Sequence, residues 1–333
     1  MESGSTPRAR SKRLQAPFAA RTLLVASLSA ACLASFFSAG AQGAISVNPS
    51  RARSVPVAAP KPARALSSSP TFVGVPIAIV DTGVAVIPAL AGRVTTGDDL
   101  TGSGSTTDID GHGTAMASIA GGGVSGICRV CTIIPVRAVG NSGLGTTELA
   151  AEGVTWAATH GARVINLSLT TSGNDPVLTA AIDNAVSAGV VVVLAAGNSG
   201  SSEPSAQGYP GASTLGAISV ASANGGGLFS WSNYGSWVGL AAPGAVTAST
   251  PTGQTFTAIG TSASAAYISG VVGLMLSCNP TLSPAQVQSI LVGTGTSLSG
   301  LGAAGRLVNV AAAAAASSSA HACEAAAQAA TAL

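Results

Sequence analysis

Short, nearly continuous apolar runs alternate with helical patterns along most of this 333-residue chain, and this alternation constrains the fold most strongly. The runs lie at 76–81, 132–139, 164–169, 190–196, 216–221 and 238–242. Because they have no regular polar positions, both faces of each strand are expected to be buried, as in a parallel sheet covered by helices. The pattern therefore predicts an α/β domain with a doubly wound, mostly parallel β-sheet flanked by helices.

Local signals place helices between the expected strands. Residues 146–160 form a helical pattern, and Asp175 followed by Pro176 is typical of an N-cap and first helical turn. A capping-box sequence at 283–286 opens another helix. In parallel sheets of this kind the site lies in loops at the carboxyl ends of the strands, so reactive residues are sought there.

The first 71 residues differ in composition from the rest. Residues 1–41 combine a basic stretch, an apolar run and small residues, which is typical of a signal peptide; an uncleaved membrane anchor is the alternative, but the apolar run is short for a span. Residues 42–71 hold five Pro, four basic residues and no acid, which indicates an extended linker or a short propeptide. The folded domain is expected at 72–313, and the Ala- and Ser-rich tail at 314–333 is either a helix or a loose segment.

The charge of the body argues against polyanionic partners. From residue 71 onward the chain has five Arg, no Lys and 11 acidic residues, a formal charge of −6. A surface that binds nucleic acid or an anionic membrane needs the opposite sign. We expect no nucleic-acid partner, no membrane association after signal cleavage, and a monomer that is exported to the periplasm or secreted.

Four cysteines remain once the leader is set aside. They are Cys128, Cys131, Cys278 and Cys323. An even number in an exported chain indicates disulfides, and three pairings are possible. We expect Cys128 to pair with Cys131, because both lie in one short loop, and Cys278 to pair with Cys323, which would anchor the tail. A zinc site is the alternative, but an oxidising compartment disfavours it.

Three residues with reactive side chains stand next to predicted strands and helices. Asp81 follows the first apolar run, where an Asx turn or N-cap is the simpler explanation. His112 lies between two glycines before a helical stretch and has no simple structural role, unlike His160 at a helix end and His321 in the tail. Ser262 precedes an apolar helix, where backbone N–H groups favour negative charge, although an ordinary N-cap serine looks the same.

A fourth residue, Asn198, follows the most apolar run. Alone it is a turn asparagine. Together with Asp81, His112 and Ser262 it completes a set of nucleophile, base, orienting carboxylate and oxyanion donor. The order Asp, His, Ser along the chain is the order found in subtilisins.

From about residue 72 to 313 the chain resembles the subtilisin-type (subtilase, peptidase family S8) serine proteases. Besides the four motifs, the matching segments lie at 164–169, 208–211, 242–244 and 305–310. The resemblance implies a subtilisin-like fold and an endopeptidase that acts on protein or peptide substrates through an acyl-enzyme, with no cofactor or metal in the chemistry. It implies that Asp81 orients His112, that His112 takes the Ser262 proton, and that Asn198 and the Ser262 N–H bind the oxyanion.

The resemblance also implies the walls of the main specificity pocket. They are Ser168, Leu169, Thr170, Ala195, Ala196 and Gly197, with Gly208 at the floor. Nearly all are small and none is acidic, so a buried Lys or Arg would have no partner. We expect a preference for large apolar or aromatic side chains on the acyl side of the cut bond.

The chain departs from the family pattern at several positions. After Ser262 the sequence at 263–267 is Ala-Ser-Ala-Ala-Tyr, where the family has Met, Ala, a small residue, Pro and His. Ala115 stands in place of a second histidine, and Thr170 in place of a glycine that borders the substrate. Residues 42–71 are also too short and Pro-rich for the folded inhibitory prodomain common in the family.

Two other interpretations have to be weighed. A sedolisin-type acid peptidase suits the serine motif, but such enzymes have Glu in place of His112 and Asp in place of Asn198. A secreted, inactive binding protein on the same scaffold would normally have lost a triad member, and none is lost.

Subtilases often bind structural Ca²⁺ through loop oxygens. The available acids are Asp98, Asp99, Asp108 and Asp110. Acids clustered in a loop are more often simply solvated, so no ligand is assigned.

Overall fold

The computed structural model describes residues 22–24, 74–123, 125–298 and 305–317. Its central sheet contains β2 (Pro76–Asp81), β3 (Asp98–Asp99), β4 (Thr132–Arg137), β6 (Val164–Leu167), β7 (Val191–Ala195), β8 (Ile218–Ala223), β9 (Leu240–Pro243), β12 (Thr296–Ser297) and β13 (Arg306–Leu307). Within the described residues the strand order is β12-β13-β9-β8-β7-β6-β2-β4-β3, and every neighbouring pair is parallel except β12 with β13. The six apolar runs correspond to β2, β4, β6, β7, β8 and β9 to within two residues at each end, which confirms the predicted parallel sheet.

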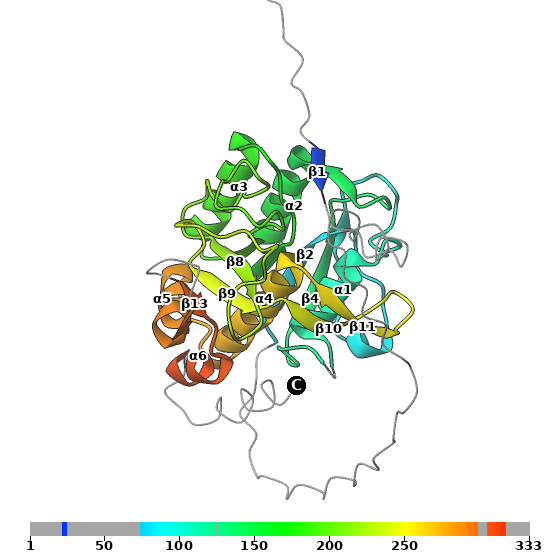
Figure 1. Ribbon diagram of the computed structural model, residues 1–333. Helices are drawn as coiled ribbons and strands as arrows, with labels where there is room; N and C mark the ends of the chain where they lie inside the picture. Colours follow the sequence, from blue (N-terminus) through cyan, green and yellow to red (C-terminus); the bar gives the residue numbers. More distant parts are fainter. Residues whose placement is uncertain (1–21, 25–73, 124, 299–304, 318–333) are drawn as a thin grey trace, which may run out of the picture.

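Helices cover both faces of this sheet (Figure 1). One face carries α1 (His112–Gly121), α4 (Thr261–Cys278), α5 (Pro284–Thr294) and α6 (Val310–Ser317), and the other carries α2 (Thr147–Thr159) and α3 (Pro176–Ser187). Successive residues of β2 alternate between the two cores: Ile77 and Ile79 pack with α1 and α4, whereas Ala78 and Val80 pack with α2 and α3. This two-sided burial is why the strands have no regularly spaced polar positions.

The predicted helix starts are present. Asp175 caps α3 by accepting hydrogen bonds from the N–H groups of Val177 and Leu178. Ser283 and Gln286 form the full capping box of α5. Among the described helices, α4 is the one long and apolar enough to cross a membrane, but most of it is buried inside the protein, as expected for a central core helix.

The chain order places a functional site near the middle of the sheet. After β2 the chain adds β3 and β4 on one side, then passes to β6 on the other side of β2. Such a reversal separates the loops that follow two neighbouring strands and leaves a crevice at their carboxyl ends. Asp81 is the last residue of β2, and Ser168 directly follows β6.

An antiparallel hairpin that the sequence analysis missed leads into α4. It consists of β10 (Ala245–Ser249) and β11 (Thr255–Ile259), in register from Ala245 with Ile259 to Ser249 with Thr255. Only Ala248, Ser249 and Ala258 in the two strands are fully buried, so the apolar signal is weak. β11 ends two residues before α4 begins and thereby positions the start of that helix.

Two described elements involve residues outside the predicted domain 72–313. β1 (Thr22–Leu24), inside the predicted signal peptide, pairs antiparallel with β5 (Leu144–Thr146). At the other end, α6 runs across the expected boundary between 313 and 314, and it buries Ala314 and Ser317. Residues 318–333 of the predicted tail lie outside the described residues.

Candidate active site

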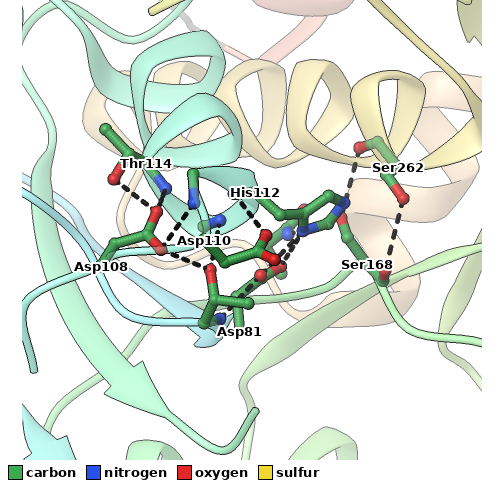
Figure 2. A network of polar contacts seen from close by, with 11 residues as sticks. Asp81, Asp108, Asp110, His112, Thr114, Ser168 and Ser262 are labelled. Atoms are coloured by element: carbon green, nitrogen blue, oxygen red, sulfur yellow. Dashed lines mark hydrogen bonds and ion pairs between the residues drawn. The ribbon is translucent and has the colours of Figure 1, made fainter. Parts of the chain in front are cut away.

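Asp81 and His112 form a buried pair at the carboxyl edge of the sheet (Figure 2). The His112 Nδ1 atom lies 2.7 Å from Asp81 Oδ1 and 2.9 Å from Oδ2. Since an ionised carboxylate only accepts hydrogen bonds, Nδ1 carries the proton, and Nε2 keeps its lone pair when the ring is neutral. Nε2 is buried and has no hydrogen-bond partner among the described residues. The ring therefore presents an unpaired basic nitrogen.

The electrostatics of His112 result from two opposing effects. Burial lowers the pKa of His112, because a charged imidazolium is poorly solvated inside the protein. Attraction to the Asp81 carboxylate and the hydrogen bond with it outweigh burial, so the pKa of His112 is raised above its ordinary value. The site thus favours proton uptake by this ring.

Two glycines allow the Asp81 and His112 segments to meet. A Cβ on Gly113 would lie 2.1 Å from the carbonyl oxygen of Gly83, which no side chain tolerates. Gly83 itself has φ 104°, and a Cβ there would lie 2.4 Å from the Thr106 carbonyl oxygen. The glycines after Asp81 and after His112 are therefore required by close backbone approach.

A second buried carboxylate, Asp108, holds the same loops together. Its four donors are Thr82 Oγ1 and Gly111 N at 2.9 Å, Thr114 N at 2.8 Å and Thr114 Oγ1 at 2.6 Å. Thr82 Oγ1 in turn accepts from the Gly113 N–H at 2.9 Å. The sequence analysis considered Asp108 only as a calcium ligand, although its position four residues before His112 was a signal for this role. Asp108 links the strand that carries Asp81 to the helix that carries His112.

Ser262 is the second residue of α4, where backbone N–H groups have no partner inside the helix. In Figure 2 the imidazole of His112 lies between the Asp81 carboxylate and Ser262. The Ser262 Oγ donates to the Ser168 carbonyl oxygen at 3.3 Å, and the Ser168 Oγ donates to the Ser262 carbonyl oxygen at 3.2 Å. The hydroxyl is thus directed to Ser168 in this structure.

Asn198 lies beside the start of the same helix. Its Oδ1 accepts from the Thr261 N–H at 2.9 Å and from Thr261 Oγ1 at 3.0 Å. With its acceptor occupied, the exposed side chain has its two Nδ2 protons to offer. Thr261 Oγ1 also accepts from the Gly197 N–H at 3.1 Å, so Thr261 orients this amide, a role that the sequence analysis missed.

Asn233 is a second positioning residue that no sequence signal distinguished. It is fully buried, and its Oδ1 accepts from the N–H groups of Ser199 and Ser201 at 3.0 and 3.1 Å. Its Nδ2 donates to the carbonyl oxygens of Ala196 and Ala206 at 3.0 and 2.8 Å. All its hydrogen-bonding capacity is used to support the loops on either side of Asn198.

The predicted pocket residues lie on neighbouring segments. β6 and β7 pair up to Leu167 and Leu194, and the segments 168–170 and 195–197 follow directly. Thr171 and Tyr209 exchange backbone hydrogen bonds at 2.9 and 3.3 Å, which brings Gly208 next to Thr170. All seven predicted residues are buried.

Close packing of neighbouring residues leaves no room for a side chain at Gly208, apart from any role of this glycine as a pocket floor. A Cβ there would lie 2.8 Å from the Pro204 Cα and 2.9 Å from the Trp237 ring. A larger residue at 208 would therefore displace these neighbours rather than simply fill the pocket.

The cysteines agree with the predicted disulfides where they are described. Cys128 and Cys131 are bonded, with a Cα–Cα separation of 5.4 Å, and both are buried. Cys278 is also disulfide-bonded. Its predicted partner, Cys323, lies outside the described residues.

The four acids considered for calcium are engaged in other ways. Among the described residues no group of three or more His, Cys, Asp or Glu side chains is arranged to hold a metal. Burial opposes ionisation of Asp99, but hydrogen bonds from Thr101, Ser103 and Gly104 lower its pKa to about 2. Asp98 accepts from the Asp99 N–H at 2.9 Å. The Asp99 and Asp108 oxygens face N–H and O–H donors, which does not fit a cation site.

Asp110 adjoins the Asp81–His112 pair. Its Oδ1 accepts from the His112 N–H at 3.2 Å, and burial raises the pKa of its carboxyl group. It contributes one hydrogen bond to the backbone of the His112 loop.

Comparison with known proteins agrees with this geometry. The profile described as Subtilase family matches residues 73–330. The chain belongs to the subtilase family. Thermitase of Thermoactinomyces vulgaris is 39% identical over 239 residues, which cover 69% of this chain and 84% of thermitase. Subtilisin Savinase of Lederbergia lenta is 35% identical over 249 residues, covering 72% of this chain and 90% of the relative.

Solved structures give the same result. A cold adapted subtilisin-like serine proteinase matches with a TM-score of 0.67 and 31% identity, over 72% of this chain and 90% of that chain. As a subtilase, the protein is a subtilisin-like serine endopeptidase, a hydrolase with protein substrates. The family resemblance and the predicted α/β fold are confirmed.

Proposed function

We propose that this subtilase cuts peptide bonds with Asp81, His112 and Ser262 as its catalytic triad and with Asn198 as an oxyanion donor. The observation that carries the proposal is the buried hydrogen bond of 2.7 Å between His112 Nδ1 and Asp81, which leaves Nε2 unpaired on the side of Ser262. A base held in this tautomer can accept only at Nε2.

The reaction follows from these positions. Rotation of the Ser262 side chain away from the Ser168 carbonyl brings its Oγ to Nε2, which takes the proton as Oγ attacks the substrate carbonyl carbon. The Ser262 N–H and the Asn198 amide donate to the oxyanion that forms. Protonated His112 then gives its proton to the leaving amine. Water attacks the acyl-enzyme by the same route, and His112 returns the proton to Ser262.

An extended substrate is proposed to add to the edge of β5 with which β1 pairs. β1 already pairs antiparallel with this edge, which supports its capacity to bind an extended segment. Gly145 of β5 bridges to Val139, whose N–H donates to the Asp81 carbonyl oxygen at 3.1 Å. Cleavage of the predicted signal peptide at residue 41 would remove β1 and free this edge.

The substrate preference proposed is for large apolar or aromatic side chains on the acyl side. The support is that the segments 168–170 and 195–197 are adjacent and offer no carboxylate to a Lys or Arg side chain. A peptide library should be cut chiefly after such residues, and cleavage chiefly after Lys or Arg would contradict the pocket.

Export by residues 1–41 and action as a monomer outside the cytoplasm are also proposed. The disulfide between Cys128 and Cys131 and the disulfide-bonded state of Cys278 support an oxidising compartment. Sequencing the N-terminus of the exported protein would locate the cleavage site.

The catalytic assignment is tested with casein and a fluorophosphonate probe. The unchanged protein should degrade casein and carry the probe on Ser262, whereas Ser262→Ala and His112→Ala should lose nearly all activity. Ser187→Ala, an exposed serine at the end of α3, is the matched control and should behave as the unchanged protein. Asn198→Ala should lower kcat by about 100-fold to 1,000-fold, the range known for subtilisin oxyanion donors, with the fold intact. A folded protein that neither binds the probe nor cuts casein would instead be an inactive binding protein.

A further inference from the structure

A buried polar side chain, Asn166, interrupts the otherwise apolar strand β6. It lies on the face of the sheet that α4 covers. Val164, two residues earlier, packs in the core on this face, whereas Ile165 and Leu167 pack in the core on the opposite face. A fully buried amide costs free energy unless hydrogen bonds replace those that it makes with water. The partners of Asn166 therefore have to be accounted for.

Asn166 connects the middle of α4 to the segment that follows β6. Its Nδ2 donates to the Ser168 Oγ at 2.9 Å. Its Oδ1 lies 2.9 Å from the Oγ of Ser269, a fully buried residue of α4. Ser269 follows Ser262 by about two helical turns, so both serines lie on the side of α4 that faces β6.

Ser168 and Ser262 are hydrogen-bonded to each other in both directions (Figure 2). The Ser168 Oγ donates to the Ser262 carbonyl oxygen, and the Ser262 Oγ donates to the Ser168 carbonyl oxygen. The first of these bonds joins the first turn of α4 to the segment 168–170 of the predicted pocket. It forms only while the Ser168 proton points to α4, because a serine hydroxyl has a single proton.

The Asn166 amide determines where the Ser168 proton points. With Nδ2 toward Ser168, the Ser168 Oγ accepts from the amide and keeps its own proton for the carbonyl oxygen on α4. If the amide were reversed, Oδ1 would face Ser168 and would take that proton. The Ser262 carbonyl oxygen would then lose this donor, and the link between α4 and the pocket segment would break.

Ser269 holds the amide in the first of these two orientations. The Asn166 Oδ1 can only accept a hydrogen bond, so Ser269 has to donate to it. A competing acceptor is the Ala265 carbonyl oxygen, 3.0 Å from the Ser269 Oγ and one turn earlier on α4. A hydroxyl that donated only along the helix would leave the amide free to turn. The direction of one buried proton thus decides how α4 is joined to Ser168.

We propose that Ser269 is a positioning residue that orients the Ser262 nucleophile through the amide of Asn166. The inference rests on the proposed function of Ser262 and adds to it a residue that cannot touch the substrate. Ser269 is fully buried and lies about 10 Å along the helix from Ser262. Its hydroxyl fixes the amide, the amide fixes the Ser168 hydroxyl, and that hydroxyl holds the nucleophile against the pocket segment.

Steady-state kinetics of Ser269→Ala with a chromogenic peptide test this proposal. The variant leaves the Asn166 Oδ1 without its donor, so the amide can turn toward Ser168. We expect kcat to fall by about 10-fold, because a small displacement of the nucleophile is costly, and KM to stay within about 2-fold, because the pocket walls are unchanged. The midpoint of the pH profile should not move, since the contact between Asp81 and His112 is untouched.

Ser277→Ala is the matched control. Ser277 also lies on α4, and its Oγ donates to the carbonyl oxygen of Gly273, four residues earlier, at 2.8 Å. The variant removes the same kind of helix bond as Ser269→Ala without affecting Asn166, so kcat should be unchanged. An equal loss of kcat in both variants would overturn the proposal, and so would an increase in KM at unchanged kcat for Ser269→Ala.

A double-mutant cycle shows whether Ser269 acts through Ser168. In a Ser168→Ala background the hydroxyl at the end of the chain is gone, so adding Ser269→Ala should lower kcat by less than about 2-fold further. Losses that multiply would show two independent effects and would overturn the proposal. If Ser269→Ala does not fold, Ser269→Cys takes its place in both experiments, because a thiol is of similar size and is only a weak donor.

A fluorophosphonate probe separates this inference from the proposed triad. An unchanged protein that is folded but is not labelled at Ser262 would overturn both. Labelling of the unchanged protein that is about 10-fold faster than labelling of Ser269→Ala would support the positioning role. Equal labelling rates in the two proteins would overturn the positioning role alone and leave the triad in place.

Discussion

Single residues at the active site act through the partners that their neighbours provide. His112 is buried, which on its own lowers the pKa of its ring, yet the adjoining Asp81 carboxylate reverses the direction of the shift. Asp81 can do this because the glycines at 83 and 113 let the two backbones approach. The reactivity of one imidazole therefore depends on space made by residues that have no side chain.

The pH dependence of activity should reflect this balance. Only neutral His112 can act as the base, so kcat/KM should rise as pH increases through its raised pKa, at a higher pH than for an ordinary imidazole. Asp81→Asn removes the main attraction and leaves burial dominant, so the rise should move to lower pH while kcat falls by about 10⁴-fold. The check is a pH profile with a chromogenic peptide. A shift to higher pH in Asp81→Asn would contradict this account.

Asp108 should prove important for stability. It is 2% exposed, and an amide at this position would place an NH₂ group among four donors. We expect Asp108→Asn to lower the free energy of unfolding by about 2–3 kcal/mol and to reduce activity as the His112 loop loosens. Urea unfolding on a Ser262→Ala background measures the first effect. Asp110→Asn is the control, with a smaller loss because, among the described residues, its carboxylate accepts a single hydrogen bond, from the His112 N–H at 3.2 Å.

At the scale of helices and strands, the approach of α1 to α4 determines where Ser262, the proposed nucleophile, lies. α4 packs against α1 and against β6, β7, β8 and β9, so its first turn is supported by the whole centre of the sheet. The contact is close because α4 carries glycine where it meets α1: a Cβ on Gly270 would lie 2.7 Å from the Ala120 carbonyl oxygen. Small residues at this contact keep α1 and α4, and with them His112 and Ser262, at their spacing.

Two glycine substitutions in helices should have opposite effects. Alanine is favoured over glycine in a helix by about 1 kcal/mol, so the sign depends on the space around each position. Gly293→Ala in α5 meets no atom within 4 Å and should stabilise the protein by about 0.5–1 kcal/mol. Gly270→Ala must displace the backbone of α1 and should lower the free energy of unfolding of the protein by about 1–3 kcal/mol. Thermal unfolding of both variants on the Ser262→Ala background would show whether the two shifts differ in sign.

For the whole molecule, the two ends of the described domain are held by different means. At the N-terminal end, the Pro76 carbonyl oxygen of β2 accepts a hydrogen bond from the Arg163 N–H, just after α2, at 3.0 Å. At the C-terminal end, α6 packs against α4 and α5 and buries Ala313 and Ala314. Cys278, the last residue of α4, is disulfide-bonded, and Cys323 is its predicted partner.

The two predicted disulfides should contribute unequally to stability. Chain-entropy estimates give about 2 kcal/mol for the loop between Cys128 and Cys131 and about 4 kcal/mol for a loop closed from Cys278 to Cys323. Replacing Cys278 and Cys323 by Ala together should therefore lower the free energy of unfolding more than replacing Cys128 and Cys131. Urea unfolding provides the comparison, and non-reducing peptide mapping should find Cys278 joined to Cys323. A peptide joining Cys278 to another cysteine would show that the tail is anchored differently.

The local pattern of the sequence was enough to predict the sheet, the caps of α3 and α5, and the residues now proposed as the triad. Buried parallel strands must be apolar on both faces, and caps depend on a side chain and a backbone group a few residues apart, so both leave a signal within a short window. The disulfide between Cys128 and Cys131 was predictable for the same reason of short separation.

Only the tertiary structure decided what surrounds those residues. Asp108 reaches Thr82 from 26 positions away, Asn233 reaches Ala196 from 37, and Ser168 reaches Ser262 from 94. Hydrogen bonds between such distant positions leave no periodic pattern in the chain, since either partner alone looks like an ordinary loop residue. The same holds for Gly208, whose need for glycine comes from Pro204 and Trp237 packing against it.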